Sequence, residues 1–198
     1  MYDGRNGYSM NVSVASILGP RNPIVNQTGT IQEVKPDEFV IVGTSGRNDA
    51  RGVVQGFLRA YSLQRPNWGQ VLWDITFTPP KALDDYPNST YLGEGGAPTI
   101  IAVSSENGVF IFRSKGHGTC WVYSLETGQQ LWTAQAYSQF YYYARGATSM
   151  SIVGGRVYTT SNVYHGRGEE LAVYNATTGK LLWNWTAPSV GYLETPYT

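Results

Sequence analysis

Histidine and cysteine, the side chains that often hold a metal ion, are scarce in this chain. His117, Cys120 and His165 are the only three in its 198 residues. Each histidine is followed by glycine, and the strand pattern described below places both histidines in corresponding turns. Two imidazoles at equivalent positions could share a metal, but a metal site needs more ligands than two. Glycine-flanked histidines are typical of solvated turns, so we expect no metal site.

Carboxylates gather in one long connecting segment, residues 78–97. Asp84, Asp85 and Glu94 lie there in a glycine-containing loop. Carboxylates on such a loop are suitable ligands for Ca²⁺, but their spacing matches no calcium-binding loop. The sequence also contains no Ser-His-Asp order, phosphate-binding loop or zinc-binding helix motif. We therefore favour a solvated loop and predict no catalytic residue.

A motif that recurs three times indicates which elements position these residues. Residues 123–132 read Tyr-Ser-Leu-Glu-Thr-Gly-Gln-Gln-Leu-Trp, and residues 174–183 read Tyr-Asn-Ala-Thr-Thr-Gly-Lys-Leu-Leu-Trp. Residues 61–73 form a third copy with three extra residues in its turn. Self-similarity on this scale predicts a repeat architecture.

Each copy of the motif reads as strand, turn and strand, with Gly128 or Gly179 supplying a positive φ in the turn. Two further strands precede each motif, and the Gly154-Gly155 pair marks the hairpin between them in the last repeat. Three units of four antiparallel strands, each with a tryptophan in its last strand, indicate the blades of a β-propeller. A β-sandwich is less favoured because it does not require a motif in every fourth strand.

We therefore predict an all-β, partial β-propeller with almost no helix. The chain is expected to be a single domain, residues 1–198, with blades at 29–80, 97–137 and 146–188. Residues 1–13 are interpreted as the remnant of a preceding blade, because Tyr2 to Gly7 resembles the turn from Tyr174 to Gly179. The structural anchors of the repeats should be largely buried and pack on their own or the next blade; these residues are Trp73, Trp132, Trp183, Gly128 and Gly179.

The recurring motif resembles the repeat of the pyrroloquinoline-quinone-like β-propellers. That repeat runs Ala-Leu-Asp, two residues, Thr-Gly, three residues and Trp. The resemblance covers residues 29–188 and the remnant at 1–13. It implies the fold, whereas the family's functions range from quinone-dependent alcohol dehydrogenases to an outer-membrane assembly scaffold and extracellular proteins.

The resemblance implies a specific quinone site in the dehydrogenases of this fold. They commonly stack the cofactor between a tryptophan and a disulfide of adjacent cysteines, with Ca²⁺ and an aspartate base. Because Cys120 is the only cysteine, that disulfide cannot form. We expect no cofactor; pyrroloquinoline quinone and Ca²⁺ are expected only if another part of the propeller supplies their ligands.

An aromatic run separates the second and third predicted blades: Tyr137, Phe140, Tyr141, Tyr142 and Tyr143. Consecutive aromatic side chains cannot all face one side of a strand. Some must face a neighbouring blade, a partner or solvent. We favour packing between blades, with a surface for carbohydrate or protein as the alternative.

Composition excludes some partners. Charged residues make up 14% of the chain, below the roughly 25% of average soluble proteins, and the formal net charge is zero. No basic patch indicates nucleic acid, and no apolar run is long enough to span a membrane. Five Asn-X-Ser/Thr sequons indicate a secreted glycoprotein, although these residues are also common in turns. The sequons are Asn11, Asn26, Asn88, Asn175 and Asn184, and exposure is expected at Asn88 and Asn175.

These observations favour a non-catalytic extracellular or cell-surface scaffold or binding module. The alternative is a fragment of a quinone-dependent dehydrogenase. Because both ends interrupt the repeat pattern, we expect a fragment completed by missing blades or by self-assembly. Residues 1–198 alone should be unstable or self-associating, since an open arc of blades exposes apolar surface.

Overall fold

The computed structural model describes residues 2–3, 7–8, 29–82, 98–114, 119–135, 150–161 and 170–186. Every regular element in these ranges is a β-strand, and they contain no helix. The predicted all-β class is therefore confirmed. The chain divides into two compact units, which are residues 1–44 with 57–75, and residues 45–56 with 76–198. Near the N-terminus, the two-residue strands β1 (Tyr2–Asp3) and β2 (Gly7–Tyr8) pair antiparallel.

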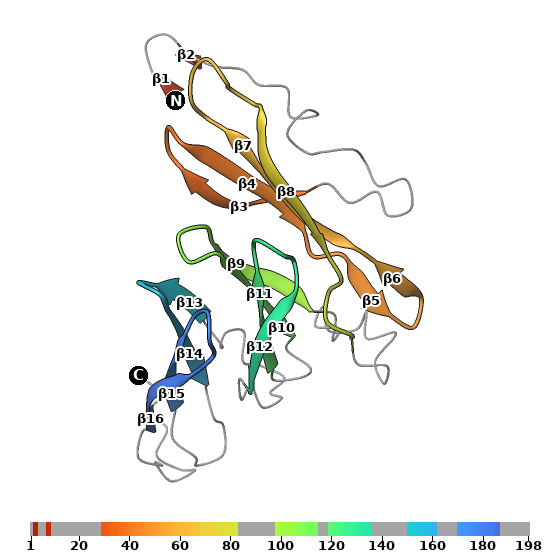
Figure 1. The fold of residues 1–198 in the computed structure, drawn as a ribbon, viewed down its shortest axis with the longest axis vertical. Helices are drawn as coiled ribbons and strands as arrows, with labels where there is room; N and C mark the ends of the chain where they lie inside the picture. The colour runs from red at the N-terminus through yellow and green to blue at the C-terminus, as the bar shows by residue number, and fades with distance from the viewer. Residues whose placement is uncertain are drawn as a thin grey trace, which may run out of the picture. The chain divides into compact units, whose positions relative to one another are not determined.

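The first four-stranded sheet has the order β3-β4-β7-β8 (Figure 1). Its strands are β3 (Thr30–Lys35), β4 (Phe39–Thr44), β7 (Gly56–Ser62) and β8 (Val71–Phe77). Valine and isoleucine dominate β4, as expected for a strand buried inside a sheet. On one face, Val40, Val42 and Tyr61 form a buried cluster, against which Leu63 packs.

A short second hairpin interrupts the chain between β4 and β7. It consists of β5 (Arg47–Asp49) and β6 (Gly52–Val54), which pair antiparallel. The sequence pattern did not predict these strands.

The second and third sheets are antiparallel meanders in which successive strands pair. The second contains β9 (Thr99–Ser104), β10 (Val109–Ser114), β11 (Thr119–Ser124) and β12 (Gln130–Gln135). The third contains β13 (Met150–Val153), β14 (Arg156–Ser161), β15 (Glu170–Asn175) and β16 (Leu181–Thr186). The three sheets lie within the residue ranges predicted for the three blades.

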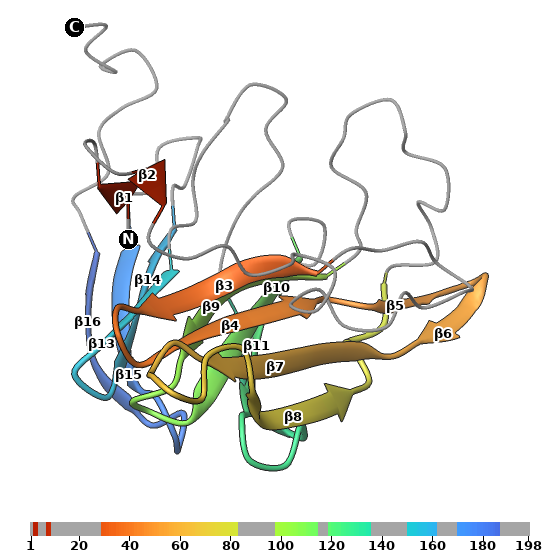
Figure 2. The same ribbon diagram turned by 90° about the horizontal axis from the view of Figure 1, so that it is seen from above.

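The second and third sheets stack face to face, as both ribbon views show (Figures 1 and 2). Their shared core combines side chains from both: Val109, Ile111, Cys120, Val122 and Ala134 with Met150, Val157 and Ala176. Burial of this apolar surface is the main force that holds the two sheets together.

The opposite face of the second sheet is covered by the segment that ends β8. The ring of Phe77 lies 4.8 Å from that of Phe110 and 5.5 Å from that of Phe112. Tyr123 completes the cluster, and its hydroxyl donates a hydrogen bond to the carbonyl of Thr78 at 3.3 Å. Burial raises the pKa of Tyr123 to about 12. The second sheet is thus packed on both faces.

Candidate functional site

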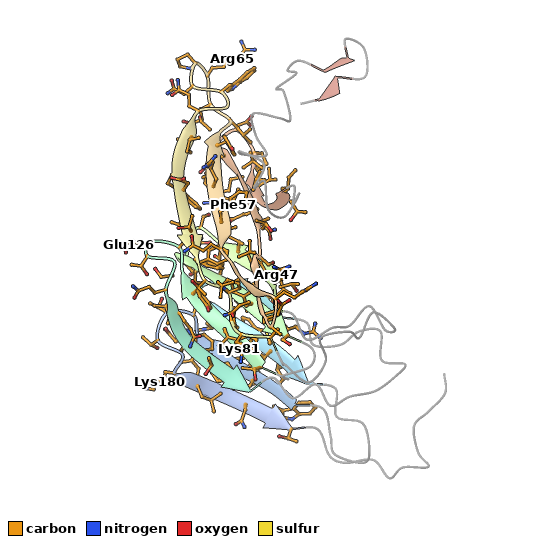
Figure 3. The ribbon with its side chains drawn as sticks, turned by 90° about the vertical axis from the view of Figure 1, so that its right-hand side faces the viewer. Arg47, Phe57, Arg65, Lys81, Glu126 and Lys180 are labelled. Carbon is orange, nitrogen blue, oxygen red and sulfur yellow. The ribbon has the colours of Figure 1, made fainter. Side chains whose placement is uncertain are left out.

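The turns of the three repeats use the same polar contact. The residue after the motif tyrosine turns its side-chain oxygen back onto the backbone. Ser124 Oγ accepts hydrogen bonds from the amides of Glu126 and Thr127, at 3.1 and 3.2 Å. Asn175 Oδ1 accepts the equivalent bonds in the third repeat, and Ser62 Oγ accepts one from Gln64 in the first. Figure 3 labels Glu126 and Lys180, which belong to the turns of the second and third sheets.

A glycine closes each of these turns. Gly69, Gly128 and Gly179 have φ values of 76°, 67° and 69°, a region that favours glycine. The backbone amide of each glycine donates a hydrogen bond to the backbone carbonyl of the polar residue in the same turn, at 2.9 to 3.0 Å. The acceptors are Ser62, Ser124 and Asn175. The first repeat keeps these bonds although its turn is three residues longer.

The Trp132 side chain joins the second sheet to the third. Its indole packs over Gly179 so closely that a Cβ there would lie 2.6 Å from Trp132 Cγ. The indole Nε1 donates a hydrogen bond to the carbonyl of Ala176 at 2.8 Å, and the ring lies 5.6 Å from that of Tyr174. We call this contact the tryptophan seam. It uses both the apolar and the polar part of the indole.

Gly128, the counterpart of Gly179 in the second repeat, has different neighbours. The carbonyl oxygen of Thr76 and the Cβ of Phe77 lie 2.5 and 3.4 Å from the position of an added Cβ. The end of β8 therefore occupies the place that an indole occupies at Gly179. Trp73 is half-buried in the first sheet.

Trp183 is the counterpart of Trp132 in the third repeat, but it is not covered in the same way. It is 47% exposed and Trp185, two residues later, is 54% exposed. The prediction that every anchor tryptophan is largely buried is therefore wrong for Trp183. Within the described residues, no repeat turn packs on its indole.

These tryptophans share one face of the third sheet. Strand pairing sets Trp183 opposite Val173 and Trp185 opposite Leu171, while Val173 lies opposite Tyr158. Side chains alternate between the faces of a strand. Val157, the neighbour of Tyr158, packs in the core shared with the second sheet, so this set faces away from it. We call this face the open face; it carries Val153, Arg156, Tyr158, Leu171, Trp183 and Trp185, together with Val173, which is fully buried.

Cys120, the one cysteine, lies in the core between the second and third sheets. It is fully buried, and this burial raises the pKa of its thiol to about 11. Within the described ranges, no three His, Cys, Asp or Glu side chains are grouped as metal ligands. Other candidate residues lie outside those ranges: His117, His165, Asp84, Asp85, Glu94 and the aromatic run at 137–143.

The asparagines of the sequons differ in their exposure to solvent. Asn184 is exposed on β16, whereas Asn175, expected to be exposed, is half-buried. The Asn175 side chain folds into its own turn, where Oδ1 also accepts a bond from the Thr178 hydroxyl at 2.9 Å. Asn11, Asn26 and Asn88 lie outside the described residues.

The β5–β6 hairpin carries a charged cluster that sequence reasoning missed. Asp49 contacts Arg51 at 2.6 Å and Arg47 at 3.5 Å. The hydrogen bond from Arg51 lowers the pKa of the Asp49 carboxyl. Two hydrogen bonds of Asn48 fix the hairpin. Its side-chain Nδ2 donates to the Pro79 carbonyl at 2.9 Å, and its backbone carbonyl accepts from the Ala82 amide at 2.7 Å. The signal was present as a turn-forming Asn-Asp-Ala-Arg-Gly segment before two valines.

Comparison with known families supplies the wider context. The family model described as "Outer membrane protein assembly factor BamB" matches residues 53–192, more than two thirds of the chain. The chain belongs to this family. The resemblance to the quinone-like propeller repeats is thereby confirmed. No curated protein gives a significant match to the sequence.

The solved structures that are similar to this chain include the following three. BamB from Moraxella catarrhalis is 14% identical with a TM-score of 0.40, covering 82% of this chain and 38% of that one. A europium-containing methanol dehydrogenase is 13% identical with a TM-score of 0.39, covering 80% and 26%. The β-propeller domain of the Trilobed protease from Pyrococcus furiosus is 10% identical with a TM-score of 0.34, covering 81% and 43%. The chain therefore spans less than half of each.

Among the described residues there is also no helix of sufficient length and apolarity to cross a membrane.

Proposed function

We propose that this chain is part of a non-catalytic β-propeller scaffold that binds another protein through the open face of its third sheet. The observation that carries this proposal is the exposure of two tryptophans and Val153 on one face. Apolar surface concentrated in one place is typical of interaction sites, and aromatic residues are enriched in protein interfaces.

The tryptophan seam supports a scaffold role. Trp132 locks the sheet that carries the open face onto the second sheet through its ring contacts and its bond to Ala176. The second sheet is itself packed against Phe77 on its other side. A surface held in this way loses little conformational entropy on binding a partner, and such preorganisation favours affinity.

The family description supports the proposal that the partner is a protein and that the chain acts at the cell surface or outside the cell. This description names an outer-membrane protein assembly factor. We extend this to the present chain as a role at the cell surface or outside the cell. The five sequons add the proposal of a secreted glycoprotein.

The alternative was a fragment of a quinone-dependent dehydrogenase. The non-catalytic proposal is supported by Cys120, which is enclosed in the core between two sheets and presents no sulfur surface on which a quinone ring could stack. We therefore assign no reaction step to this chain.

A photo-crosslinking experiment tests the proposal. A benzophenone amino acid replaces Val153 on the open face or, as the matched control, Val34 in the first sheet, which are 62% and 50% exposed. The protein is then expressed in its native source. We expect position 153, and not position 34, to crosslink to one protein, and the double substitution Trp183→Ser, Trp185→Ser to abolish the product.

Two results would overturn the proposal. The first is crosslinking that does not differ between positions 153 and 34. The second is retention of pyrroloquinoline quinone and Ca²⁺ through gel filtration together with substrate-dependent dye reduction, which would support the dehydrogenase alternative.

A further inference from the structure

Strand β16 is an edge strand of the third sheet. It is last in the strand order, so within the part of the chain that the structure describes one side of its backbone has no neighbouring strand. All six residues from Leu181 to Thr186 are exposed, and none is charged. Edge strands that are apolar and uncharged are templates for pairing with another strand.

The outer edges of the other sheets differ from β16. Strand β8 carries Asp74, which pairs with Arg59 at 3.1 Å and places a charge at that edge. Strand β12 is partly buried, because Trp132 lies in the seam and Ala134 lies in the core. Only β16, among these three described strands, combines full exposure with an absence of charge.

The sequence of β16 is complementary to itself. In an antiparallel pair of β16 strands centred on Asn184, Trp183 of each copy lies opposite Trp185 of the other. Directly opposed aromatic side chains are among the favourable cross-strand pairs. Because Trp183 and Trp185 share the open face, both tryptophan pairs would form on the same side of the extended sheet.

We propose that two copies of this chain associate by antiparallel pairing of β16 with β16, about a two-fold axis at Asn184. This inference rests on the proposed function, since it identifies a second copy as a protein partner of the same sheet. The pairing continues the hydrogen-bonded ladder that already joins β13, β14, β15 and β16.

Charge does not oppose this pairing. The formal net charge of the chain is zero, so two copies do not repel each other as a whole. Lys180 is the charge nearest to β16 in the sequence before it. In the proposed register the two Lys180 residues would be separated by eight residues, or about 27 Å along the strands. That exceeds the Debye length of about 10 Å at moderate salt.

The area available indicates a weak dimer. A buried tryptophan contributes about 150–250 Å², and the four indoles concerned are already about half-buried, so they add at most about 500 Å². Stable complexes bury about 1,200 Å² or more. The proposed dimer should therefore form reversibly, in a concentration-dependent way.

Charge substitution at the two-fold axis tests the register. Sedimentation velocity is measured over a concentration series for the wild type, Asn184→Lys, Asn184→Asp and an equimolar mixture of these two variants. The matched control is Thr133→Lys, because Thr133 holds the same repeat position in β12 and is also exposed. We expect dimers for the wild type and the control, association at least about tenfold weaker for each Asn184 variant alone, and recovery in the mixture.

Recovery in the mixture is the decisive result, because only a register that sets the two Asn184 positions opposite each other brings lysine to aspartate. Unchanged thermal melts establish that the variants fold. A wild type that stays monomeric, an Asn184→Lys variant that still dimerises, or a mixture that does not recover would each overturn the inference. If the wild type is monomeric but position 153 still crosslinks to another protein, self-pairing fails and the proposed function stands. If the wild type dimerises but position 153 crosslinks to no other protein, the self-pairing stands and the proposed function fails.

Discussion

Trp132 and Trp183 occupy the same position in consecutive repeats and have different surroundings. Trp132 packs over Gly179 and donates a hydrogen bond to Ala176, while Trp183 remains 47% exposed. Each follows the equivalent strand of its repeat and the same kind of turn. The difference teaches that the motif does not bury its own tryptophan: burial of Trp132 is completed by the turn of the third repeat. The predictions below separate the two residues by this criterion.

The largest difference is expected for truncation of the two indoles. Trp132→Ala should lower the free energy of unfolding by about 3–5 kcal/mol, because a packed side chain and its hydrogen bond are lost. Trp183→Ala should cost about 1 kcal/mol, because half of that side chain is already in water. Urea denaturation followed by circular dichroism measures both values, and equal losses would contradict the distinction.

Cys120 offers a local probe of the same seam. Its thiol is buried between the second and third sheets, and burial raises its pKa to about 11, so native protein should react slowly with thiol reagents. Trp132→Ala should speed labelling by about a hundredfold, corresponding to about 3 kcal/mol of easier opening. Trp183→Ala should leave the rate nearly unchanged. Labelling of the wild type at the rate of a free thiol would show that the seam is open.

Glycine substitutions separate steric contact from backbone strain. Gly179→Ala places a methyl group against Trp132 at a positive φ, whereas Gly154→Ala meets no atom within 4 Å at a φ of 53°. Strain in the left-handed region costs about 1–2 kcal/mol at either site. Gly179→Ala should therefore destabilise the protein by about 1–3 kcal/mol beyond Gly154→Ala. Similar losses at both sites, measured by urea denaturation, would remove the steric part of the explanation.

The smallest effect is expected on the other face of the second sheet. Tyr123→Phe should cost about 1 kcal/mol through the lost hydrogen bond to Thr78. Burial raises the pKa of Tyr123 to about 12, while the unfolded chain ionises near 10. Stability from the neutral phenol is therefore complete below pH 10 and is lost as the pH rises toward 12. The alkaline loss should be smaller in Tyr123→Phe, and identical pH profiles would contradict this assignment.

The strands and turns could be predicted because their signals are local. Gly128 and Gly179 stand where the backbone needs a positive φ, and the alternating apolar residues around them have the period of a strand. The β5–β6 hairpin was missed because its strands are three residues long, too short for such a period to appear. Asn175 was misjudged because a sequon says nothing about whether the asparagine side chain already accepts hydrogen bonds from its own turn.

By itself, the sequence determined that the chain forms three repeats of four strands, with a tryptophan in the last strand and a glycine turn before it. Periodicity and turn chemistry act between residues that are close in the chain, so a single repeat is enough to reveal them. Tertiary structure decided what each anchor touches. Gly128 meets Phe77, Gly179 meets Trp132, and Trp183 meets no repeat turn among the described residues. Burial of an anchor depends on which residues, distant in the sequence, pack against it. Equivalent motifs therefore acquire different surroundings.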